Sequence, residues 1–572
     1  MSSAAKMMRV EEGAVIDSAP PRGKYVAYED RFHVDLPDRT WPNQRIRKAP
    51  VWCSVDLRDG NQSIPSPMTV EQKITFFKLL TSIGFKEIEI GYPAASLAER
   101  QFTRALLEQG LIPDDVTPQV LIAAREDLIR ETFECIKGMP RAIIHIYTPT
   151  SVAQREQVFK MTPEEVIASA VRATRVVREL VDMSDIDVTF QFSPESFTGT
   201  EREFSRDICN AVINEWNPRP DEKIIINLPS TVEHSMPNRF ADLIEWMSRS
   251  LDRRESVTLS VHPHNDRGTG IASSELALLA GADRVEGTLF GNGERAGNVD
   301  LVILALNMYG QGIDPRLCFR DLPRVREVYE SCFGLRVPER HPYAGDLAVV
   351  AFSGTHQAAI RKGIEHRERV GSTNWDIPYI PVDFKDFGRN YTPIMVNAQS
   401  GKNGAAFILD REFGCRMPPQ MEPVFAQEVQ AWCDAHGVVM PPEKLWEVFE
   451  SAFVRPKETF ALRSFTAREV GDQIRATLEL MVEGVRVVTI HGFGNGPIDA
   501  TTKAFQGIGR YVSVKHFSEH SRGEGSDAEA IAYLQLERDG VSTFGVGIDA
   551  NIQMASIHAL IAGVNRLETG PG

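Results

Sequence analysis

The sequence predicts an α/β protein in which an eight-stranded (β/α)8 barrel precedes a smaller α+β domain. From about residue 51 to 330, short apolar strands alternate with polar loops and amphipathic helices. Eight strand–helix units occupy this stretch, which matches a TIM barrel in number and in length. The end of the chain instead carries a duplicated pattern of strand, glycine and helix.

The eight expected strands follow one another through the first half of the chain. They are residues 51–57, 86–92, 117–124, 142–148, 187–193, 223–229, 257–263 and 284–290. Helical patterns lie between them, for example at 70–84 and 163–180. A doubly wound open sheet is the competing fold, but it usually carries a glycine-rich dinucleotide turn after its first strand. This chain has DLRDGNQS at that place, which favours the barrel.

We expect four segments along the chain. They are an N-terminal arm (1–45), the barrel (46–335), linker subdomains (336–463) and a C-terminal domain (464–572). The linker contains a long stretch rich in proline, glycine and asparagine, and long ordered loops of this kind usually cover a functional site. Residues 431–463 have a helical pattern that leads into the last domain.

The C-terminal domain contains an internal repeat. The segments HGFGNGPIDATTKAF and FGVGIDANIQMASIHAL both run from a strand through Gly-x-Gly to Ile-Asp-Ala and into a helix. A pair of strands precedes each segment, so we expect a β-β-β-α-like unit that occurs twice. A coincidental Gly-x-Gly is the alternative.

Composition and charge exclude several classes of protein. With 42% hydrophobic and 25% charged residues, the chain is typical of a soluble globular protein. It contains no run of 18 apolar residues and no apolar signal core at its start, so we expect no membrane segment. Seven scattered cysteines without a CxxC pair indicate reduced thiols in the cytoplasm. The net charge of −15 argues against nucleic-acid binding, and an anionic substrate would need local cations.

The stretch LSVHPHNDRG suggests a metal site. On a strand, His262 and His264 point to the same face, and catalytic groups of such barrels lie where the strands end. The first strand ends in Arg58 and Asp59, and Asn298 follows the eighth strand. Strands one, seven and eight become neighbours when the barrel closes. Four candidate ligands, Asp59, His262, His264 and Asn298, can therefore surround one ion. Two imidazoles with oxygen ligands suit Zn²⁺, Mn²⁺ or Co²⁺, and Mg²⁺ less well; ordinary strand-end histidines are the alternative.

Three motifs, taken together, resemble the α-isopropylmalate synthase family. They are DLRDGNQ, HPHNDRG and GNGERAGN. The likeness continues through FSPESFTGTE, NLPSTVE, RHPYAGDLAVVAFSGTHQ, IPYIPVD and GNGPIDA, which together span nearly the whole chain. HPHND alone would be shared with homocitrate and citramalate synthases. The resemblance implies condensation of acetyl-CoA with 2-oxoisovalerate and water to 2-isopropylmalate, the committed step of leucine biosynthesis.

The same resemblance implies roles for individual residues. A 2-oxo acid chelates a metal ion, and Arg58 would stabilise the alkoxide that develops on the keto oxygen; a structural ion pair is its alternative. Glu195 and Thr231 would orient the oxo acid. His356 would be the general base, with Glu195 as relay partner and Tyr391 nearby. An exposed histidine and an ordinary surface glutamate are the alternatives for the base and its relay.

The resemblance also implies a pocket and partners. The branched side chain of the oxo acid would lie among four residues, Leu121, His145, Ser193 and Asn227. Acetyl-CoA would be the co-substrate, approaching along the glycines of GNGERAGN, and a divalent metal would be joined by a monovalent cation such as K⁺. The linker of one subunit would complete the site of its partner, which predicts a homodimer.

We expect leucine to bind the C-terminal repeat as an effector. Helix N-termini attract carboxylates, and glycine permits close approach of backbone. The residues that would form the pocket are Gly494, Gly496, Pro497, Ile498, Asp499, Ala500, Ile548, Asp549 and Ala550. An aspartate would meet the ammonium group of leucine, while isoleucine and alanine side chains line its side chain. The alternative is that these glycines serve only folding or dimer packing.

Three rival functions remain at this point. A citramalate or homocitrate synthase would use the same motifs on another oxo acid. A barrel aldolase or lyase would cleave rather than condense, but the C-terminal repeat argues against a simple lyase. A non-catalytic ligand sensor would leave the converging Arg58, Asp59, His262 and His264 without a role.

Overall fold

A computed structural model describes residues 28–389, 401–436, 440–523, 525 and 528–569. These residues form two compact units. The first ends at Pro338 and includes Pro342–Ala344, and the second comprises Glu339–His341 and the chain from Gly345 onward. None of the helices in the described part of the chain combines the length and apolar character needed to cross a membrane.

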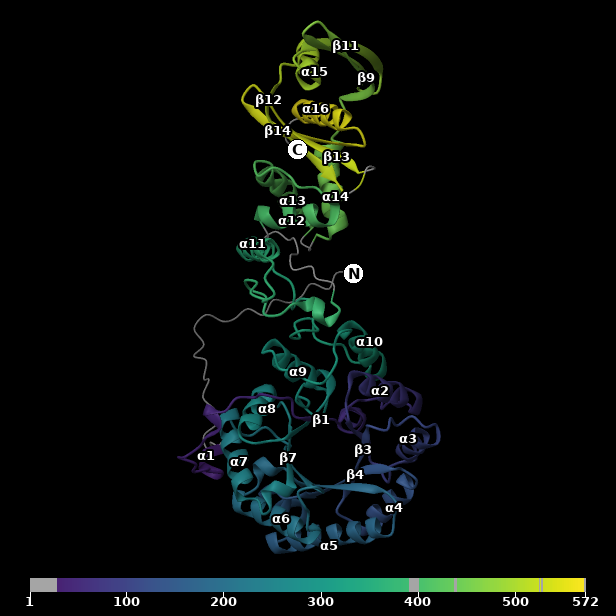
Figure 1. Cartoon of the computed structure of the whole chain (residues 1–572), viewed down its shortest axis with the longest axis vertical. Coiled ribbons are helices and arrows are strands. Elements are labelled where there is room, and N and C mark those ends of the chain that lie inside the picture. The colour runs from purple at the N-terminus through teal and green to yellow at the C-terminus, as the bar shows by residue number, and fades with distance from the viewer. Residues whose placement is uncertain (1–27, 390–400, 437–439, 524, 526–527, 570–572) are drawn as a thin grey trace, which may run out of the picture. The chain divides into compact units, whose positions relative to one another are not determined.

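The first unit contains a closed parallel barrel whose eight strands follow chain order (Figure 1). The strands are β1 Val51–Ser54, β2 Glu87–Gly91, β3 Thr117–Ala123, β4 Arg141–Pro149, β5 Asp187–Glu195, β6 Ile224–Ser230, β7 Val257–Pro263 and β8 Arg284–Gly287. Strand β1 pairs in parallel with both β2 and β8, which closes the ring. The barrel prediction is therefore confirmed, and the open doubly wound sheet is excluded.

Helices surround the ring of strands (Figure 1). They are α2 Val70–Ile83, α3 Leu97–Glu108, α4 Glu126–Ile136, α5 Pro163–Asp182, α6 Arg202–Trp216, α7 Pro237–Ser250, α8 Gly270–Leu279, α9 Leu301–Gly310 and α10 Leu322–Phe333. Local sequence sets their ends. Thr69 and Gln72 form a capping box at the start of α2, and Gly84 ends that helix with a positive φ of 114°.

Three strands end two or more residues away from their predicted limits, at the end where the site lies. Strand β1 stops at Ser54 because the chain then winds into one turn, residues 56–60. In that turn the N–H groups of Arg58, Asp59 and Gly60 all donate to the Val55 carbonyl. Strand β8 ends at residue 287 rather than 290, and β5 continues to residue 195. Both predictions for β1 and β8 were therefore too long.

The described part of the N-terminal arm lies on its own barrel. It includes α1 Tyr28–Arg31 and a short turn, Trp41–Asn43. The Thr40 N–H donates to Glu245 Oε1 at 2.9 Å, and Trp41 Nε1 donates to Asp242 Oδ1 at 2.9 Å. Both acceptors belong to α7. Residues 1–27 of the predicted arm lie outside the described residues.

The second unit begins with helices and continues into the C-terminal domain. The helices are α11 Gly354–Val370, α12 Gly401–Phe413, α13 Glu422–His436 and α14 Pro442–Phe449. Helices α12 to α14 share one hydrophobic core with β13 and β14 of the last domain. The expected helix through residue 463 is wrong at its end, because strand β9 begins at Phe460. There the backbone pairs with Val482 of β10, and the Phe460 side chain is buried.

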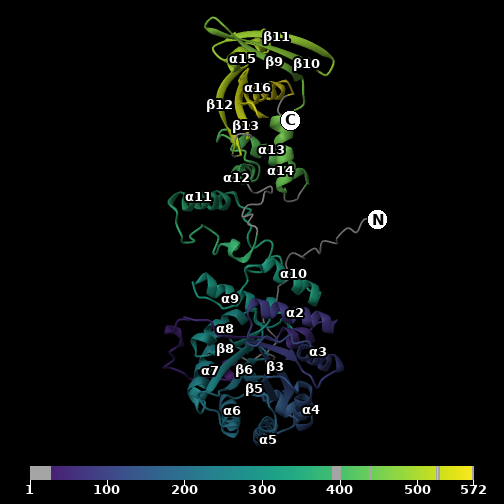
Figure 2. The same ribbon diagram turned by 45° about the vertical axis from the view of Figure 1, so that its right-hand side comes forward.

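The C-terminal domain contains two copies of a β-β-β-α unit, which confirms the predicted repeat. The first copy is β9 Phe460–Val470, β10 Gln473–Val482, β11 Arg486–Gly494 and α15 Pro497–Gln506. The second copy is β12 Ser513–Arg522, β13 Glu529–Arg538, β14 Val541–Asp549 and α16 Ile552–Thr569. Helix α15 packs on β10 and β11, and α16 packs on β13 and β14 (Figure 2).

The glycines of the repeat bring strand and helix into close contact. A Cβ atom at Gly492 would lie 2.1 Å from the Ala500 carbonyl oxygen of α15. A Cβ atom at Gly547 would lie 2.0 Å from the Ala555 carbonyl oxygen of α16. No other residue has a side chain small enough for this approach. The duplicated glycines on the strands therefore have a packing role in both copies.

Candidate active site

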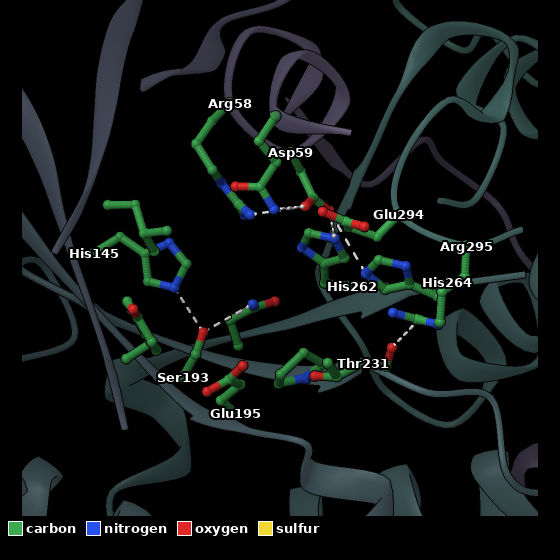
Figure 3. A pocket seen from close by; sticks show the side chains of 15 residues that line it. Arg58, Asp59, His145, Ser193, Glu195, Thr231, His262, His264, Glu294 and Arg295 are labelled. Carbon is green, nitrogen blue, oxygen red and sulfur yellow. Dashed lines mark hydrogen bonds and ion pairs between the residues drawn. The ribbon is translucent and has the colours of Figure 1, made fainter. Parts of the chain in front are cut away.

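A cavity of about 290 Å³ lies at the carboxyl ends of the barrel strands (Figure 3). Its walls include ten residues predicted from the sequence: Arg58, Asp59, Leu121, His145, Ser193, Glu195, Asn227, Thr231, His262 and His264. They come from six of the eight strands, β1 and β3 to β7, or from the loops that follow these strands. Barrel closure thus brings together residues that are far apart in the sequence.

Three of these residues form a compact cluster. One ligand atom from each of Asp59, His262 and His264 lies within 4.8 Å of the others. Asp59 Oδ2 is 3.3 Å from His262 Nε2 and 3.6 Å from His264 Nε2. Figure 3 shows both rings turned toward the carboxylate, and their centroids are 5.3 Å apart with planes at 10°. The expectation that positions i and i+2 point to one side of the strand end is confirmed.

Asn298, the fourth predicted ligand, lies beside this cluster. It is buried in the loop after β8, and its Oδ1 is 2.6 Å from His262 Nε2. Its amide nitrogen donates to the Asn292 carbonyl at 2.9 Å, which leaves the oxygen facing the histidine. The structure therefore gathers two imidazoles, one carboxylate and one amide oxygen in one buried place.

This donor set fits a divalent cation. Asp59 Oδ2 and His264 Nδ1 are buried side-chain atoms without a hydrogen-bond partner among the described residues. Buried polar atoms normally have partners, so such atoms indicate a place for an additional group. Histidine with oxygen donors is the ligand chemistry of a borderline metal such as Zn²⁺ or Mn²⁺. The site's residues are thus of the right type and burial to hold the ion that the sequence predicts.

The charges of the cluster favour the ligating forms of two members. Burial opposes ionisation of Asp59, but the Arg58 guanidinium, 3.0 Å from Oδ1, and the two histidines hold its pKa well below the usual range. Burial and the neighbouring His262 lower the pKa of His264 to about 4, so its imidazole is neutral at physiological pH. Both residues therefore present lone pairs to a cation.

His262 has a different balance. Burial disfavours its charged form, but the adjacent carboxylates of Asp59 and Glu286 raise its pKa to about 10. A cation bound at this place would replace the proton on the ring, so metal binding there releases a proton.

Two buried carboxylates beneath the cavity were not found from the sequence. Glu89 of β2 pairs with the Arg58 Nε and lies 2.8 Å from His145 Nδ1. Glu286 of β8 lies 2.8 Å from His262 Nδ1. The sequence feature that could have revealed them is a glutamate within each of the apolar strands EIEIG and RVEG. Parallel barrel strands are buried on both faces, so a charge within one needs a buried partner.

The opposite wall of the cavity carries the residues expected to contact the substrate. His145 Nε2 lies 2.7 Å from Ser193 Oγ, which also accepts from Asn227 Nδ2 at 3.0 Å. Leu121 also lines the cavity, as do two residues that sequence reasoning missed, Tyr147 and Pro229. The lining of the cavity therefore combines apolar, polar and charged side chains.

Glu195 and Thr231 line the rim. Glu195 belongs to strand β5 and is partly buried, so it is not the ordinary surface glutamate of the alternative interpretation. Burial raises the pKa of its carboxyl group, against the lowering effect of Arg58. Thr231 Oγ1 accepts from the Ser196 N–H at 2.9 Å. The remaining lining residues, which the sequence did not single out, are Gln62, Glu294 and Arg295.

The predicted base lies in the other compact unit. His356 is exposed near the start of α11, and its ring stacks on Tyr379 with centroids 3.9 Å apart. Tyr391 lies outside the described residues. The assignment of the base to His356, with Glu195 as relay and Tyr391 nearby, therefore stays a prediction.

The residues predicted to bind leucine lie at the starts of the two domain helices. Gly494 ends β11, Gly496 precedes α15, and Pro497 is its first residue. Ile498 and Ala500 belong to the core of the domain, Ala500 fully buried and Ile498 partly so.

The two aspartates of the repeat differ in their surroundings. Asp499 Oδ2 accepts from the Asn495 N–H and from Lys503 Nζ, both at 2.9 Å. Asp549 Oδ1 accepts from the Asn551 N–H at 2.8 Å, and Ala550 between them is exposed. The leucine site remains a prediction.

Comparison with known proteins agrees with this geometry along the whole chain. Residues 49–328 match the HMGL-like family, and residues 346–410 match the alpha-isopropylmalate synthase, post-catalytic domain-like family. Residues 439–568 match the LeuA allosteric (dimerisation) domain. Similar proteins named 2-isopropylmalate synthase occur in Corynebacterium efficiens (46% identity, covering 96% of this chain and 97% of that protein) and in Clostridium acetobutylicum (47%, covering 95% and 99%).

The chain belongs to the 2-isopropylmalate synthase family. The resemblance drawn from DLRDGNQ, HPHNDRG and GNGERAGN is thereby confirmed. In this family context, the metal cluster and the cavity lie in the part of the chain that matches the HMGL-like family, residues 49–328. The duplicated β-β-β-α unit lies within the LeuA allosteric domain match. A simple barrel lyase or a non-catalytic sensor is not favoured.

Proposed function

We propose that the barrel condenses acetyl-CoA with 2-oxoisovalerate (3-methyl-2-oxobutanoate) and water to give 2-isopropylmalate and CoA. This is an acyl transfer and the committed step of leucine biosynthesis. One observation carries the proposal: the cluster of Asp59, His262 and His264 lies beside Arg58 in the barrel of a chain related over its full length to 2-isopropylmalate synthases. The cluster supplies a reason for the chemistry, and the relatives indicate the substrate.

The metal would be held by Asp59, His262, His264 and Asn298. A divalent cation there supplies Lewis acidity to the keto group of the oxo acid. The chain's own contribution is to keep these donors buried and close together before substrate arrives. Mg²⁺, Mn²⁺ and Zn²⁺ are the candidates, and Zn²⁺ or Mn²⁺ suits the two imidazoles best. A monovalent cation such as K⁺ is a further expectation for turnover.

Arg58 would stabilise the negative charge that develops on the keto oxygen. Its guanidinium is largely buried, holds Asp59 and Glu89 with two of its nitrogens, and still lines the cavity. A guanidinium fixed by two carboxylates keeps its orientation without reorganising during the reaction, and preorganised charge is the main source of electrostatic catalysis. Its structural ion pairs and its catalytic role are therefore compatible.

The cavity walls would select the oxo acid. Leu121, Tyr147 and Pro229 would offer apolar surface to the isopropyl group. His145, Ser193 and Asn227 would supply the polar part of the same pocket. Thr231 and Glu195 at the rim would orient the carboxylate end of the oxo acid. An apolar pocket distinguishes ligands that differ by one methylene only about 10- to 200-fold. Pyruvate and longer oxo acids are therefore expected as slower substrates.

Removal of a proton from the acetyl methyl group requires a base, and we assign it to His356. The ordinary pKa of histidine suits this task, and Glu195 would act as its relay partner. By the family resemblance, the base would belong to the linker, and Tyr391 would act with it. In a homodimer the linker of one subunit would complete the site of the other.

Control by leucine is the second part of the proposal. The effector would bind the C-terminal repeat, with its carboxylate near the start of a helix and its ammonium near Asp499 or Asp549. The match of residues 439–568 to the LeuA allosteric (dimerisation) domain supports both an effector role and dimer formation.

An assay of thiol release tests the proposed reaction. Acetyl-CoA is supplied with a panel of 2-oxo acids, the acyl product is identified by mass spectrometry, and the series is repeated with chelator and with added Mn²⁺, Mg²⁺ or Zn²⁺. We expect 2-oxoisovalerate to be the best substrate and the chelator to stop turnover reversibly. A preference for pyruvate would indicate a citramalate synthase, and unchanged turnover in chelator would contradict the metal site.

A further inference from the structure

Glu286 lies behind the metal cluster rather than in it. This β8 glutamate is fully buried, and its Oε2 is 2.8 Å from His262 Nδ1. The other ring nitrogen, His262 Nε2, faces Asp59 Oδ2 at 3.3 Å. The imidazole therefore lies between two carboxylates, one on the cluster side and one on the barrel side.

The other histidine of the cluster lacks such a partner. His264 Nδ1 is buried without a hydrogen bond to any residue that the structure describes, and its Nε2 faces Asp59 at 3.6 Å. Of the two imidazoles, only His262 is held from behind by a carboxylate. Within the pair, the β8 glutamate thus orients the ring of His262 only.

The carboxylate of Glu286 is itself held in one orientation. Its Oε1 accepts from Arg284 Nη1 at 2.7 Å, from Gln191 Nε2 at 2.7 Å and from Gln119 Nε2 at 3.1 Å. With three donors on Oε1, the second oxygen is left to His262 and to the amide of Asn227. A carboxylate can only accept, so the Nδ1 atom of that histidine carries a proton, and Nε2 is the ring nitrogen left to present a lone pair to a bound cation.

Glu286 also reaches the substrate side of the cavity. Its Oε2 accepts from Asn227 Nδ2 at 3.2 Å, and the same amide nitrogen donates to Ser193 Oγ at 3.0 Å. One buried carboxylate therefore touches a predicted metal ligand and a predicted substrate residue.

We propose that Glu286 is the positioning residue of the metal site. It accepts the Nδ1 proton of His262, fixes the ring and its tautomer, and aims the Nε2 lone pair at the place shared with Asp59. The inference rests on the proposed function in assigning a metal to Asp59, His262 and His264. Outer carboxylates of this kind typically change metal affinity or activity about 10- to 100-fold when they are replaced.

The test compares two glutamates that share one arginine. Arg284 pairs with Glu286 through Nη1 and with Glu87 through Nε, and Glu87 lies on β2 two residues before the site-facing Glu89. Glu286→Gln and Glu87→Gln each remove one carboxylate from that arginine. Only the first removes the acceptor of His262, so Glu87→Gln is the matched control for the loss of a buried ion pair.

The expected result follows from the shape of the amide. In Glu286→Gln the amide oxygen is best placed toward the three donors around Oε1, which turns the NH₂ group toward His262. The ring must then accept at Nδ1 and carry its proton on Nε2, where a metal would bind. Mn²⁺ is titrated into the metal-free full chain and free Mn²⁺ is counted by electron paramagnetic resonance. We expect about 10- to 100-fold weaker binding for Glu286→Gln and wild-type affinity for Glu87→Gln.

Each outcome decides the matter. Equal Mn²⁺ affinity in Glu286→Gln and Glu87→Gln would overturn the inference, and so would equal weakening in both variants. If Glu286→Gln does not fold, Glu286→Asp keeps the charge but shortens the reach to His262, and wild-type affinity there would likewise overturn it. A wild-type chain that binds no Mn²⁺ would instead remove the metal site of the proposed function, and this inference with it. The titration needs no turnover, so failure of the proposed reaction is detected separately.

Discussion

The barrel and the C-terminal domain both carry short motifs dense in glycine and polar residues, but the structure uses these motifs differently. In HPHND the side chains converge: His262 and His264 meet Asp59 from another strand, within 4.8 Å. In the paired Gly-x-Gly motifs, Gly492 and Gly547 face the helices of their own repeats at distances that admit no side chain. One motif brings chemical groups together, and the other brings backbones together.

The difference teaches how far a motif supports a function. Converging side chains from separate strands have little structural reason to be buried together, since burying polar groups costs free energy unless they are partnered. Glycines between a strand and a helix are fully explained by the close packing of the two backbones. The metal site therefore rests on its own geometry, whereas the leucine site needs an observation beyond the glycines of the repeat.

The largest effect is expected at the metal cluster. His264→Ala removes one ligand from the strand end without opening the core, so the protein should fold and lose bound metal and turnover together. The loss of several kcal/mol of Lewis-acid stabilisation corresponds to a rate decrease on the order of 10³-fold or more. Metal analysis and the thiol-release assay check this result. Stoichiometric metal with full turnover in the variant would contradict the site.

The base assignment gives the next largest effect. His356→Asn should bind 2-oxoisovalerate about as well as the wild type but condense it roughly 10²- to 10⁴-fold more slowly, since general-base catalysis contributes that much. Calorimetry of the oxo acid and single-turnover rates separate the two steps. His366→Asn, a substitution of another exposed histidine of α11, is the control and should leave turnover unchanged. Near-normal turnover in His356→Asn would move the base elsewhere, with Glu195 next in line.

Much of the fold and of the site could be predicted because strand periodicity and barrel closure are strong constraints. Eight alternating units fix which strands become neighbours, and that order brings Asp59 and His262 together from positions 203 residues apart in the numbering. The predicted strand at β1 was too long because the alternation of apolar and charged residues there is also typical of a strand. In the structure, residues 56–60 instead form a turn whose N–H groups donate to the Val55 carbonyl.

The buried carboxylates could not be placed in the same way. In EIEIG, Glu87 and Glu89 alternate with isoleucine, a pattern that normally indicates a strand with one solvated face. In a closed barrel both faces are covered, and the face carrying these glutamates points to the interior, where they meet Arg284 and Arg58. Their partners are set by three-dimensional closure, which local sequence does not contain.

The glycine side of the comparison is tested by stability. Gly492→Val would push a side chain into the Ala500 carbonyl, 2.1 Å from an added Cβ, whereas Gly496→Val meets nothing within 4 Å and has an extended backbone with φ of −163°. Overpacking costs roughly 1–3 kcal/mol, so Gly492→Val should unfold in less denaturant than the wild type. Gly496→Val should unfold at the wild-type midpoint in the same titration. Equal midpoints for the two variants would show that the strand glycines have no packing role.

The smallest effect, and the sharpest for the comparison, concerns leucine. Gly496 provides no capping side chain to α15, so backbone N–H groups at the start of that helix are available to the carboxylate of an effector. A valine there would crowd the ligand without disturbing the fold, since an added Cβ has open space.

We expect leucine to inhibit the full-length enzyme. Gly496→Val should raise the leucine concentration for half-inhibition about tenfold or more, because that factor corresponds to the loss of one charge-assisted hydrogen bond. Basal turnover should be unchanged, because the residue lies outside the barrel. Inhibition curves and calorimetry of leucine on both proteins check this expectation. If leucine binds both proteins equally, Gly496 does not adjoin the effector, and the effector site lies elsewhere in the domain.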